Sequence, residues 1–397
     1  MYQAWQKALF ILSIYGINNN NRDDKMKIGF VVALSMVSVL LVGCATPTTK
    51  SPQGSAAEIE REARLQKELL LNRYIAESKD VHDVAFPVLE KNAALCEDTA
   101  YSLGMNLWNK YTVPEGYQTT AEINHGVGDV MQILFTYDNG PAQLFGLERG
   151  DHIVAVNGIE VKKGKQAKAN IDELLDTDAP QVDFIISRDG EEMQKIVQRS
   201  KVCDFGIVYD PNDMAVNAFA DGENIIITRG MKRFVENDNE LALVVAHEIG
   251  HNAMGHIDKK KLNRAGAGAG GLVLDVLAAA AGVNTCGAFT DMAMQAGAGA
   301  YSVEFEQEAD YVGMYFMERA GYDTKNVANF WRRMAAENSG AGIDQRSTHP
   351  ATAERFVAIE KTYAEIQQKI AAGRVLEPEI DLEKEARREK QKSRGFN

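Results

Sequence analysis

Two histidines and a glutamate in one short stretch have the types and the spacing needed to bind a metal ion and to use it. They are His247, Glu248 and His251. Residues four apart lie on one face of a helix, about one turn from each other, so both imidazoles can reach one tetrahedral zinc ion. Glu248 is then placed to polarise a metal-bound water. The spacing predicts a zinc hydrolase site; a buried helix with two polar turns is the alternative.

An acidic stretch downstream can complete such a site. Residues 302–310 read Ser-Val-Glu-Phe-Glu-Gln-Glu-Ala-Asp. A catalytic zinc needs a third protein ligand and leaves its fourth position for water. Glu306 and Asp310 share a helical face, so Glu306 can bind the metal while Asp310 accepts the free N–H of a ligand histidine. From the spacing alone, a solvated acidic face is an equally good interpretation.

The apolar pattern indicates which elements position these residues. The run 241–245 buries the metal-binding helix and holds its ligands rigidly. The β-branched stretch 224–228 predicts a strand beside that helix, at a sheet edge where substrate backbone can pair. Residues 265–300 are rich in Gly and Ala around an apolar core, and Asp275 argues against a membrane span. We expect a helical hairpin near the active site.

Taken together, residues 206–365 resemble the zinc peptidases that include the CAAX prenyl protease, HtpX and BepA-type proteins. The matching motifs are Asn217-Ala218-Phe219, Thr228-Arg229-Gly230-Met231, Glu240-Leu241-Ala242, the stretch from His247 to His251, Glu306 to Asp310 with Gly313, Ala320-Gly321-Tyr322-Asp323, and Thr348-His349-Pro350. The resemblance implies one zinc ion per chain, bound by His247, His251 and Glu306. It also implies that Glu248 is the catalytic base and that Asp310 supports a ligand histidine. It adds that the Gly- and Ala-rich segment covers the cleft.

Two other histidines of this region are interpreted differently. The resemblance places His349 at the active site, where it can donate to the developing oxyanion or occupy the open fourth position of the metal. We favour the second role, a gate, because a peptidase among envelope proteins needs restraint. A purely structural role in the helix start at Pro350 is the third interpretation. His256 follows His251 by five residues and points elsewhere on the helix, so we expect it at the surface.

A second region, residues 81–205, has the pattern of a small β domain. A short helix ends at Gly146, a tight turn occupies residues 149–151, and a strand over 153–156 ends at the Asn157-Gly158 turn. Further strands are expected over 130–135 and 182–187. The pattern resembles the PDZ domains of bacterial proteases of the DegP type, which implies binding of an extended peptide along a sheet edge. A spacer without an open groove is the alternative.

The loop that would bind a peptide carboxylate in this region has no clear sequence signal. Gly126-Val127-Gly128 is the candidate that the sequence offers.

The N-terminal part predicts export and a lipid anchor. Residues 26–44 combine a basic start with about 14 apolar residues, short of the roughly 20 that span a membrane. Their end, Leu41-Val42-Gly43-Cys44, resembles a bacterial lipobox, which implies lipidation of Cys44. Ala45 after it resembles an outer-membrane address. We expect translation to start at Met26.

A flexible tether and a charged helix follow this anchor. The apolar stripe of the helix is expected to pack in the core, with a partner helix as the alternative. The stripe consists of Ile59, Leu65, Leu69 and Leu70.

The cysteine pattern predicts one disulfide. The four cysteines do not form C-x-x-C pairs, which argues against a cysteine-bound zinc. With Cys44 lipidated, three remain, and exported proteins pair the cysteines they can. Cys96 and Cys203 bracket the PDZ-like region, so we expect them to be bonded and Cys286 to be free.

These patterns predict an α+β protein, with a PDZ-like β domain before a mainly helical zinc metallopeptidase domain that carries a short edge sheet. The expected parts are 1–43 (extension and signal peptide), 44–80 (tether and charged helix), 81–205 (PDZ-like), 206–365 (metallopeptidase) and 366–397 (charged tail).

The expected function is zinc-dependent cleavage of misfolded or unassembled envelope proteins, by a lipoprotein on the outer membrane facing the periplasm. The alternatives are an envelope chaperone with a latent peptidase site, and a scaffold with a structural zinc. A net charge of −13 disfavours nucleic acid as a partner.

Overall fold

The computed structural model describes residue 49 and the ranges 51–260, 301–339, 349 and 351–380. It divides into two compact units, Met1–Arg61 and Glu62–Asn397. The predictions for the signal peptide, for Cys44 and Cys286, and for the Gly- and Ala-rich segment lie outside the described residues. Among the described residues, no helix has the length and apolar character that crossing a bilayer requires.

The first described helix, α3 (Ala56–Lys91), differs along its length. Its buried residues begin at Leu71. The apolar stripe before that point is exposed, with Ile59 62% and Leu69 69% exposed. The prediction that this stripe packs in the core is therefore wrong, because the described elements bury only the C-terminal half of the helix.

The buried half of α3 joins the helical core that follows later in the chain. Val81 and Phe86 share one apolar cluster with Leu241 and Phe316. The domain boundary expected at residue 81 therefore falls inside a continuous helix.

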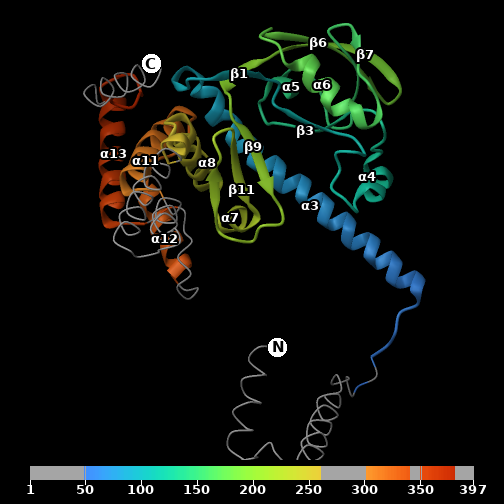
Figure 1. The fold of residues 1–397 in the computed structure, drawn as a ribbon, viewed down its shortest axis with the longest axis horizontal. Coiled ribbons are helices and arrows are strands. Elements are labelled where there is room, and N and C mark those ends of the chain that lie inside the picture. The colour runs from blue at the N-terminus through green and yellow to red at the C-terminus, as the bar shows by residue number, and fades with distance from the viewer. Residues whose placement is uncertain (1–48, 50, 261–300, 340–348, 350, 381–397) are drawn as a thin grey trace, which may run out of the picture. The chain divides into compact units, whose positions relative to one another are not determined.

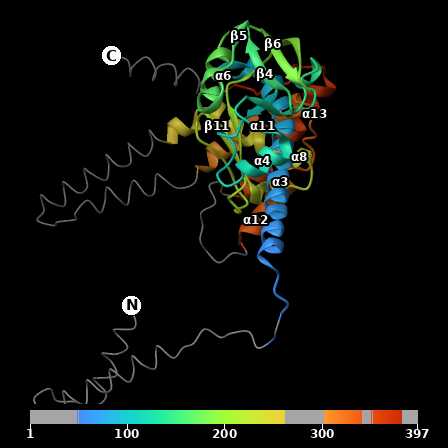
Figure 2. The same cartoon turned by 90° about the vertical axis from the view of Figure 1, so that its right-hand side faces the viewer.

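Residues 99–203 form a mainly antiparallel sheet region (Figure 1). Its elements are β1 (Thr99–Ser102), β2 (Met105–Trp108), α4 (Gln118–His125), β3 (Gln132–Thr136), α5 (Pro141–Leu144), β4 (His152–Val156), β5 (Ile159–Glu160), α6 (Ala167–Leu175), β6 (Gln181–Arg188), β7 (Glu191–Gln198) and β8 (Ser200–Cys203). The larger sheet has the order β2-β3-β4-β6-β7, with β5 paired to β4. Figure 2 shows α6 beside β4.

The strands of this sheet form where side chains alternate between core and surface. In β6, Val182, Phe184 and Ile186 are buried, and the residues between them are more exposed. β1 and β8 pair separately, with Thr99 opposite Cys203. Cys203 forms a disulfide with Cys96, the pair expected from the sequence, with Cα atoms 5.5 Å apart.

The C-terminal region is mainly helical. It contains β9 (Gly206–Asp210), β10 (Ala218–Ala220), β11 (Asn224–Thr228), α7 (Arg229–Phe234), α8 (Asp238–Ala253), α11 (Val303–Arg319), α12 (Val327–Ser339) and α13 (Ala353–Ala371). The three strands have the order β10-β11-β9. The strand expected over 224–228 is therefore present, but it lies at the centre of its sheet, because β9 pairs with its second side. β10 forms the edge and contacts α8.

Two glycines let α8 and α11 approach each other closely. A Cβ atom on Gly250 would lie 3.0 Å from the carbonyl oxygen of Ala309. A Cβ atom on Gly313 would lie 3.0 Å from the backbone nitrogen of His247. Side chains at either position would push the helices apart. The close crossing brings the first turns of α11 against the last turns of α8.

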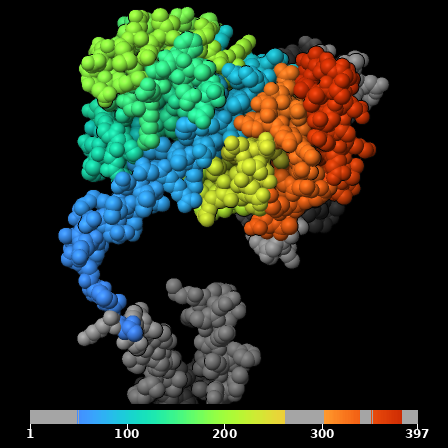
Figure 3. Space-filling model, turned by 180° about the vertical axis from the view of Figure 1, so that it is seen from behind, coloured from blue at the N-terminus to red at the C-terminus, as the bar shows by residue number. Residues whose placement is uncertain are grey.

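The end of the described chain packs on this core. α13 lies along α11 (Figures 1 and 3). Beyond α13, the backbone carbonyl of Leu376 accepts a hydrogen bond from Arg319, and the backbone N–H of Glu379 donates to the Tyr311 hydroxyl. The boundary expected at residue 366 for the charged tail therefore falls inside α13, and the residues after the helix contact α11 although most of them are exposed.

Candidate metal centre

Helix α8 is built to carry its polar residues inside the protein. The Asn237 side chain caps the helix by accepting from the backbone N–H of Glu240. From Leu241 to Asn252 every residue is buried. His247 and His251 have no solvent exposure, so their surroundings must satisfy their ring nitrogens.

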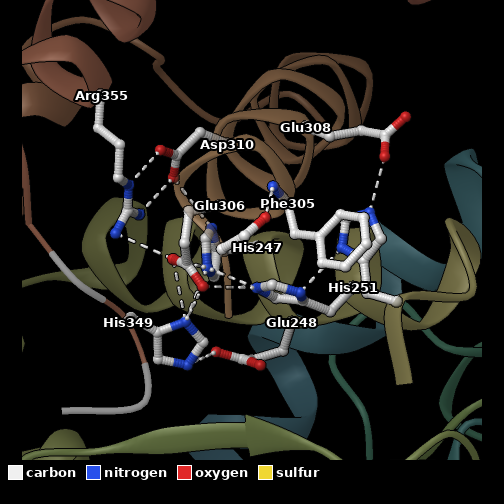
Figure 4. A network of polar contacts seen from close by, with 11 residues as sticks. His247, Glu248, His251, Phe305, Glu306, Glu308, Asp310, His349 and Arg355 are labelled. Atoms are coloured by element: carbon white, nitrogen blue, oxygen red, sulfur yellow. Dashed lines mark hydrogen bonds and ion pairs between the residues drawn. The ribbon is translucent and has the colours of Figure 1, made fainter. Parts of the chain in front are cut away.

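The structure brings the three predicted ligands together with a fourth residue. Glu306, on α11, places its carboxylate oxygens 3.4 Å from Nε2 of both His247 and His251. Nδ1 of His349 lies 2.9 Å from the same carboxylate. All four ligand atoms lie within 4.8 Å of one another, and all four residues are buried (Figure 4).

Asp310 and Arg355 support this group from behind. The Asp310 carboxylate lies 3.0 Å from Nδ1 of His247, which is the contact that the sequence predicts. Arg355 is 1% exposed, and its guanidinium lies 2.9 Å from both Asp310 and Glu306. Arg355 was not anticipated from the sequence. A signal exists, because it shares the buried stripe of α13 with Ile359 and Ile366.

Glu248 lies on the opposite side of the group. Its Oε1 is 3.3 Å from Nε2 of His349. Its Oε2 is buried and has no hydrogen-bond partner within the described ranges. Burial raises the pKa of Glu248, and the charges of His349 and His247 lower it. A water that reacts at this site needs an acceptor for its proton. A carboxylate oxygen that lies next to the ligand group and has no protein partner can be that acceptor.

The charges of the group are unevenly distributed. Burial would lower the pKa of His247, but Asp310 and Glu306 raise it to about 10. Burial lowers the pKa of His251 to about 3. Burial also opposes ionisation of Glu306, yet His349 and the two ligand histidines hold its pKa far below the usual range. The site therefore keeps a carboxylate and a neutral imidazole ready as ligands.

Two rings at this site differ from what the sequence predicted. Tyr301 was not expected there, and His256 was expected at the surface. Tyr301 stacks on His251, with ring centroids 4.0 Å apart. His256 is fully buried, so the prediction that it lies at the surface is wrong. The contact of its Nδ1 with Nδ1 of His251, at 3.0 Å, explains why. Tyr301 lies just before α11, and Glu308 of α11 contacts Nε2 of His256, so spacing along one helix does not reveal these neighbours.

The residues present fit a zinc ion. Zinc in proteins prefers imidazole nitrogen and carboxylate oxygen in a four-coordinate set. His247, His251 and Glu306 supply three such atoms, and the fourth position can be taken by water or by His349. The buried Oε2 of Glu248 lies ready to accept from that water.

Comparison with known proteins relates this site to peptidases. Residues 184–363 match the family model described as Peptidase family M48. The mitochondrial metalloendopeptidase OMA1 of Schizosaccharomyces pombe is 30% identical over 168 residues, which cover 41% of this chain and 47% of that protein. The beta-barrel assembly-enhancing protease of Yersinia pestis is 30% identical over 139 residues, covering 33% and 28%. The chain thus spans about half or less of the length of these relatives.

Among solved structures, the HtrA3 PDZ domain bound to a phage-derived ligand is 19% identical. It covers 26% of this chain and 90% of its own, with a TM-score of 0.22.

Proposed function

We propose that this chain, whose residues 184–363 match the model of peptidase family M48, is a zinc-dependent endopeptidase of the bacterial envelope that cleaves misfolded or unassembled proteins. One observation carries the proposal. His247, His251 and Glu306 converge as metal ligands, and Glu248 lies beside them with a buried oxygen that no described residue satisfies. Ligands plus a positioned base are what metal-assisted amide hydrolysis needs.

The mechanism follows from the positions of these side chains. When bound, zinc lowers the pKa of a coordinated water and polarises the scissile carbonyl. Glu248 accepts the proton of the attacking water and passes it to the leaving amine. The Asp310 carboxylate lies 3.0 Å from Nδ1 of His247 and so favours the ring orientation with Nε2 toward the metal. Arg355 balances the charge of Asp310 and Glu306.

Strand β10 is the proposed site for the substrate backbone. The Asn252 side chain, on α8, accepts from the backbone N–H of Gly222 and donates to the carbonyl of Asn224. It therefore ties the turn between β10 and β11 to the helix that carries the metal ligands. The backbone N–H of Ala220, in β10, lies close enough to the Glu248 carboxylate to lower its pKa. A peptide added along the free edge of β10 would lie next to the base.

His349 is proposed as the gate of the site. Its Nδ1 lies 3.3 Å from Nε2 of His247 and 2.9 Å from Glu306, so it stands among the ligands, not at a distance from them. A ligand at the fourth position excludes the water that Glu248 needs.

If His349 gates the site, His349→Ala should raise kcat for an unfolded test protein while the zinc content stays at one per chain. If His349 instead stabilises the oxyanion, the same change lowers kcat by roughly 10²–10³-fold. Unchanged kcat and KM would remove both roles.

The sheet region is proposed as a PDZ-like module that selects peptide. β2 is an edge strand, and a groove of about 570 Å³ is lined by Met105 and Leu107 of β2 and by Lys168 and Asp172 of α6. An extended segment can pair with β2 there. The turn at 126–128 does not line this groove, so the residues just before β2 are better placed to bind a chain end.

Location and attachment are proposed from the sequence and from the relatives. The lipobox-like end at Cys44 would be lipidated and would place the chain on the outer membrane facing the periplasm. A relative named as a beta-barrel assembly-enhancing protease supports an envelope role. Clickable palmitate should label the wild type and not Cys44→Ala; labelling of the variant would overturn the assignment.

Proteolysis of an unfolded test protein separates this proposal from its alternatives. Glu248→Gln keeps the shape of the side chain but cannot accept the proton, so kcat should fall by roughly 10²–10⁴-fold with zinc retained. A wild type that binds zinc and protects unfolded protein without cleaving it would favour the latent peptidase or the scaffold. Glu304→Gln, an exposed change on α11, is the matched control and should keep full activity.

A further inference from the structure

His256 is a buried imidazole that the mechanism above does not use. It follows the end of α8 and has no solvent exposure. Its Nδ1 lies 3.0 Å from Nδ1 of His251, and its Nε2 lies 2.8 Å from the carboxylate of Glu308 on α11. Figure 4 shows Glu308 reaching from α11 toward this side of the ligand group, away from Glu306.

The positions of the protons allow one arrangement of the hydrogen bonds that join His251, His256 and Glu308. A histidine that offers Nε2 to a metal carries its proton on Nδ1. His251 must therefore donate from Nδ1, and His256 must accept on its own Nδ1. The remaining ring nitrogen of His256 then carries the proton and donates it to Glu308. A carboxylate accepts well, so every hydrogen bond in the series has one donor and one acceptor.

We propose that His256 and Glu308 are positioning residues for the metal site, which hold His251 in the tautomer and orientation that present Nε2 to zinc. The inference rests on the proposed function, because it needs the metal. Partners behind ligand histidines are a general feature of zinc sites. Here the two ligands are served differently, since His247 meets the Asp310 carboxylate directly and His251 meets Glu308 through a second imidazole.

Two aromatic rings fix the planes of this imidazole pair. Tyr301 stacks on His251 with centroids 4.0 Å apart and an angle of 25°. Phe305 stacks on His256 at 4.6 Å and 21°. Because each ring is held on a face, neither can rotate far from the hydrogen-bonding plane. Lys259 lies 3.9 Å from the Glu308 carboxylate, so a cation also stands beside the acceptor of His256.

The experiment measures the zinc affinity of the full chain by competition with a chromophoric chelator. His256→Ala should weaken zinc binding by roughly 10–100-fold, the range found for partners behind metal ligands. Glu308→Ala should weaken it less, because His256 remains. Glu308→Gln should recover part of the loss, since its amide oxygen still accepts from Nε2–H of His256.

A double-variant cycle separates positioning from a general loss of structure. If Glu308 acts only through His256, then His256→Ala/Glu308→Ala should bind zinc no more weakly than His256→Ala alone. Independent effects on folding or on the local field would multiply instead, and that result would overturn the inference. Glu304→Ala removes an exposed carboxylate from the same helix and should leave zinc affinity within about twofold.

The outcomes also distinguish this inference from the proposed function. A wild type that binds no zinc would remove the proposed function itself. A wild type that binds one zinc, with His256→Ala and Glu308→Ala unchanged in affinity, would overturn the positioning role alone.

Discussion

The sheet region and the helical region bury different kinds of side chain. The core of the larger sheet is apolar, with Ile153, Phe184 and Ile186 among its fully buried residues. The crossing of α8 and α11 instead encloses a group of ionisable side chains. They are His247, Glu248, His251, His256, Glu306, Asp310, His349 and Arg355, none more than 5% exposed. Apolar burial stabilises the first region, whereas the second depends on each charge meeting its partner.

The largest effect expected from this difference follows removal of a metal ligand. Glu306→Ala takes one of three protein ligands, so zinc affinity should fall by more than about 100-fold, beyond the range for outer partners. Metal content after dialysis, measured by atomic absorption, tests this. Full zinc occupancy would remove Glu306 as a ligand.

Removing a buried counter-charge tests the helical region without the metal. Arg355→Met keeps the volume but leaves Glu306 and Asp310 without their cation. The free energy of unfolding of the metal-free protein should fall by about 3–5 kcal/mol. Urea unfolding measures it, and Arg332→Met, on a largely exposed pair with Glu360, is the matched control. A loss below about 1 kcal/mol would mean that Arg355 contributes little.

A substitution that creates a cavity in the core of the sheet region should lower stability without changing zinc affinity. Ile186 is fully buried, and Ile186→Ala should lower the free energy of unfolding by about 2–5 kcal/mol. Zinc affinity should stay unchanged, because no ligand is displaced. A parallel loss of zinc would show that the two regions are not separable in this way.

The smallest effect concerns a partly exposed pair in the helical region. Glu240 lies 2.5 Å from Arg333. Burial opposes ionisation of Glu240, but the hydrogen bonds from Arg333 and from the backbone N–H of Glu236, together with the Arg333 charge, outweigh it, so the pKa is lowered. A carboxyl group whose pKa is lower in the folded than in the unfolded protein stabilises the fold at pH values above its unfolded-state pKa. This contribution is lost as the pH falls through its folded-state pKa.

Glu240→Gln should therefore cost at most about 1 kcal/mol at pH 7, and the difference from wild type should shrink as the solution is acidified below pH 4. Unfolding curves at pH 7, 5 and 3.5 provide the comparison. A difference that grows toward acid pH would reverse the sign assigned to this pair.

Features set by spacing within one element could be predicted from the sequence. The positions of His247, Glu248 and His251 follow from the helical repeat, and the alternation of β6 follows from the pleat. Features set by contact between elements could not. β11 became central because residues 206–210 form β9 beside it, and the short run Ile207-Val208-Tyr209 does not reveal which strand it will pair with.

The same limit applies to the supporting residues. Glu308 reaches the metal group from α11, which Gly250 and Gly313 allow close to α8, and Arg355 reaches it from α13, which lies along α11. His256 looked peripheral because its position after α8 was judged without Phe305 and Glu308 of α11, which contact it.

The pairing of β1 with β8 has a further consequence for how the chain can be altered. Thr99 pairs with Cys203, and the disulfide between Cys96 and Cys203 joins the chain at the same place. The roughly hundred residues of the sheet region therefore leave the helical region and return to it at the same place. A segment with joined ends can be replaced by another whose ends are equally close, provided that the new segment also covers Leu71 and Ile75 of α3, which pack on Trp108 and Phe135. Chimeras that replace the sheet region at this point and keep that contact should retain the metal centre and acquire a new choice of partner.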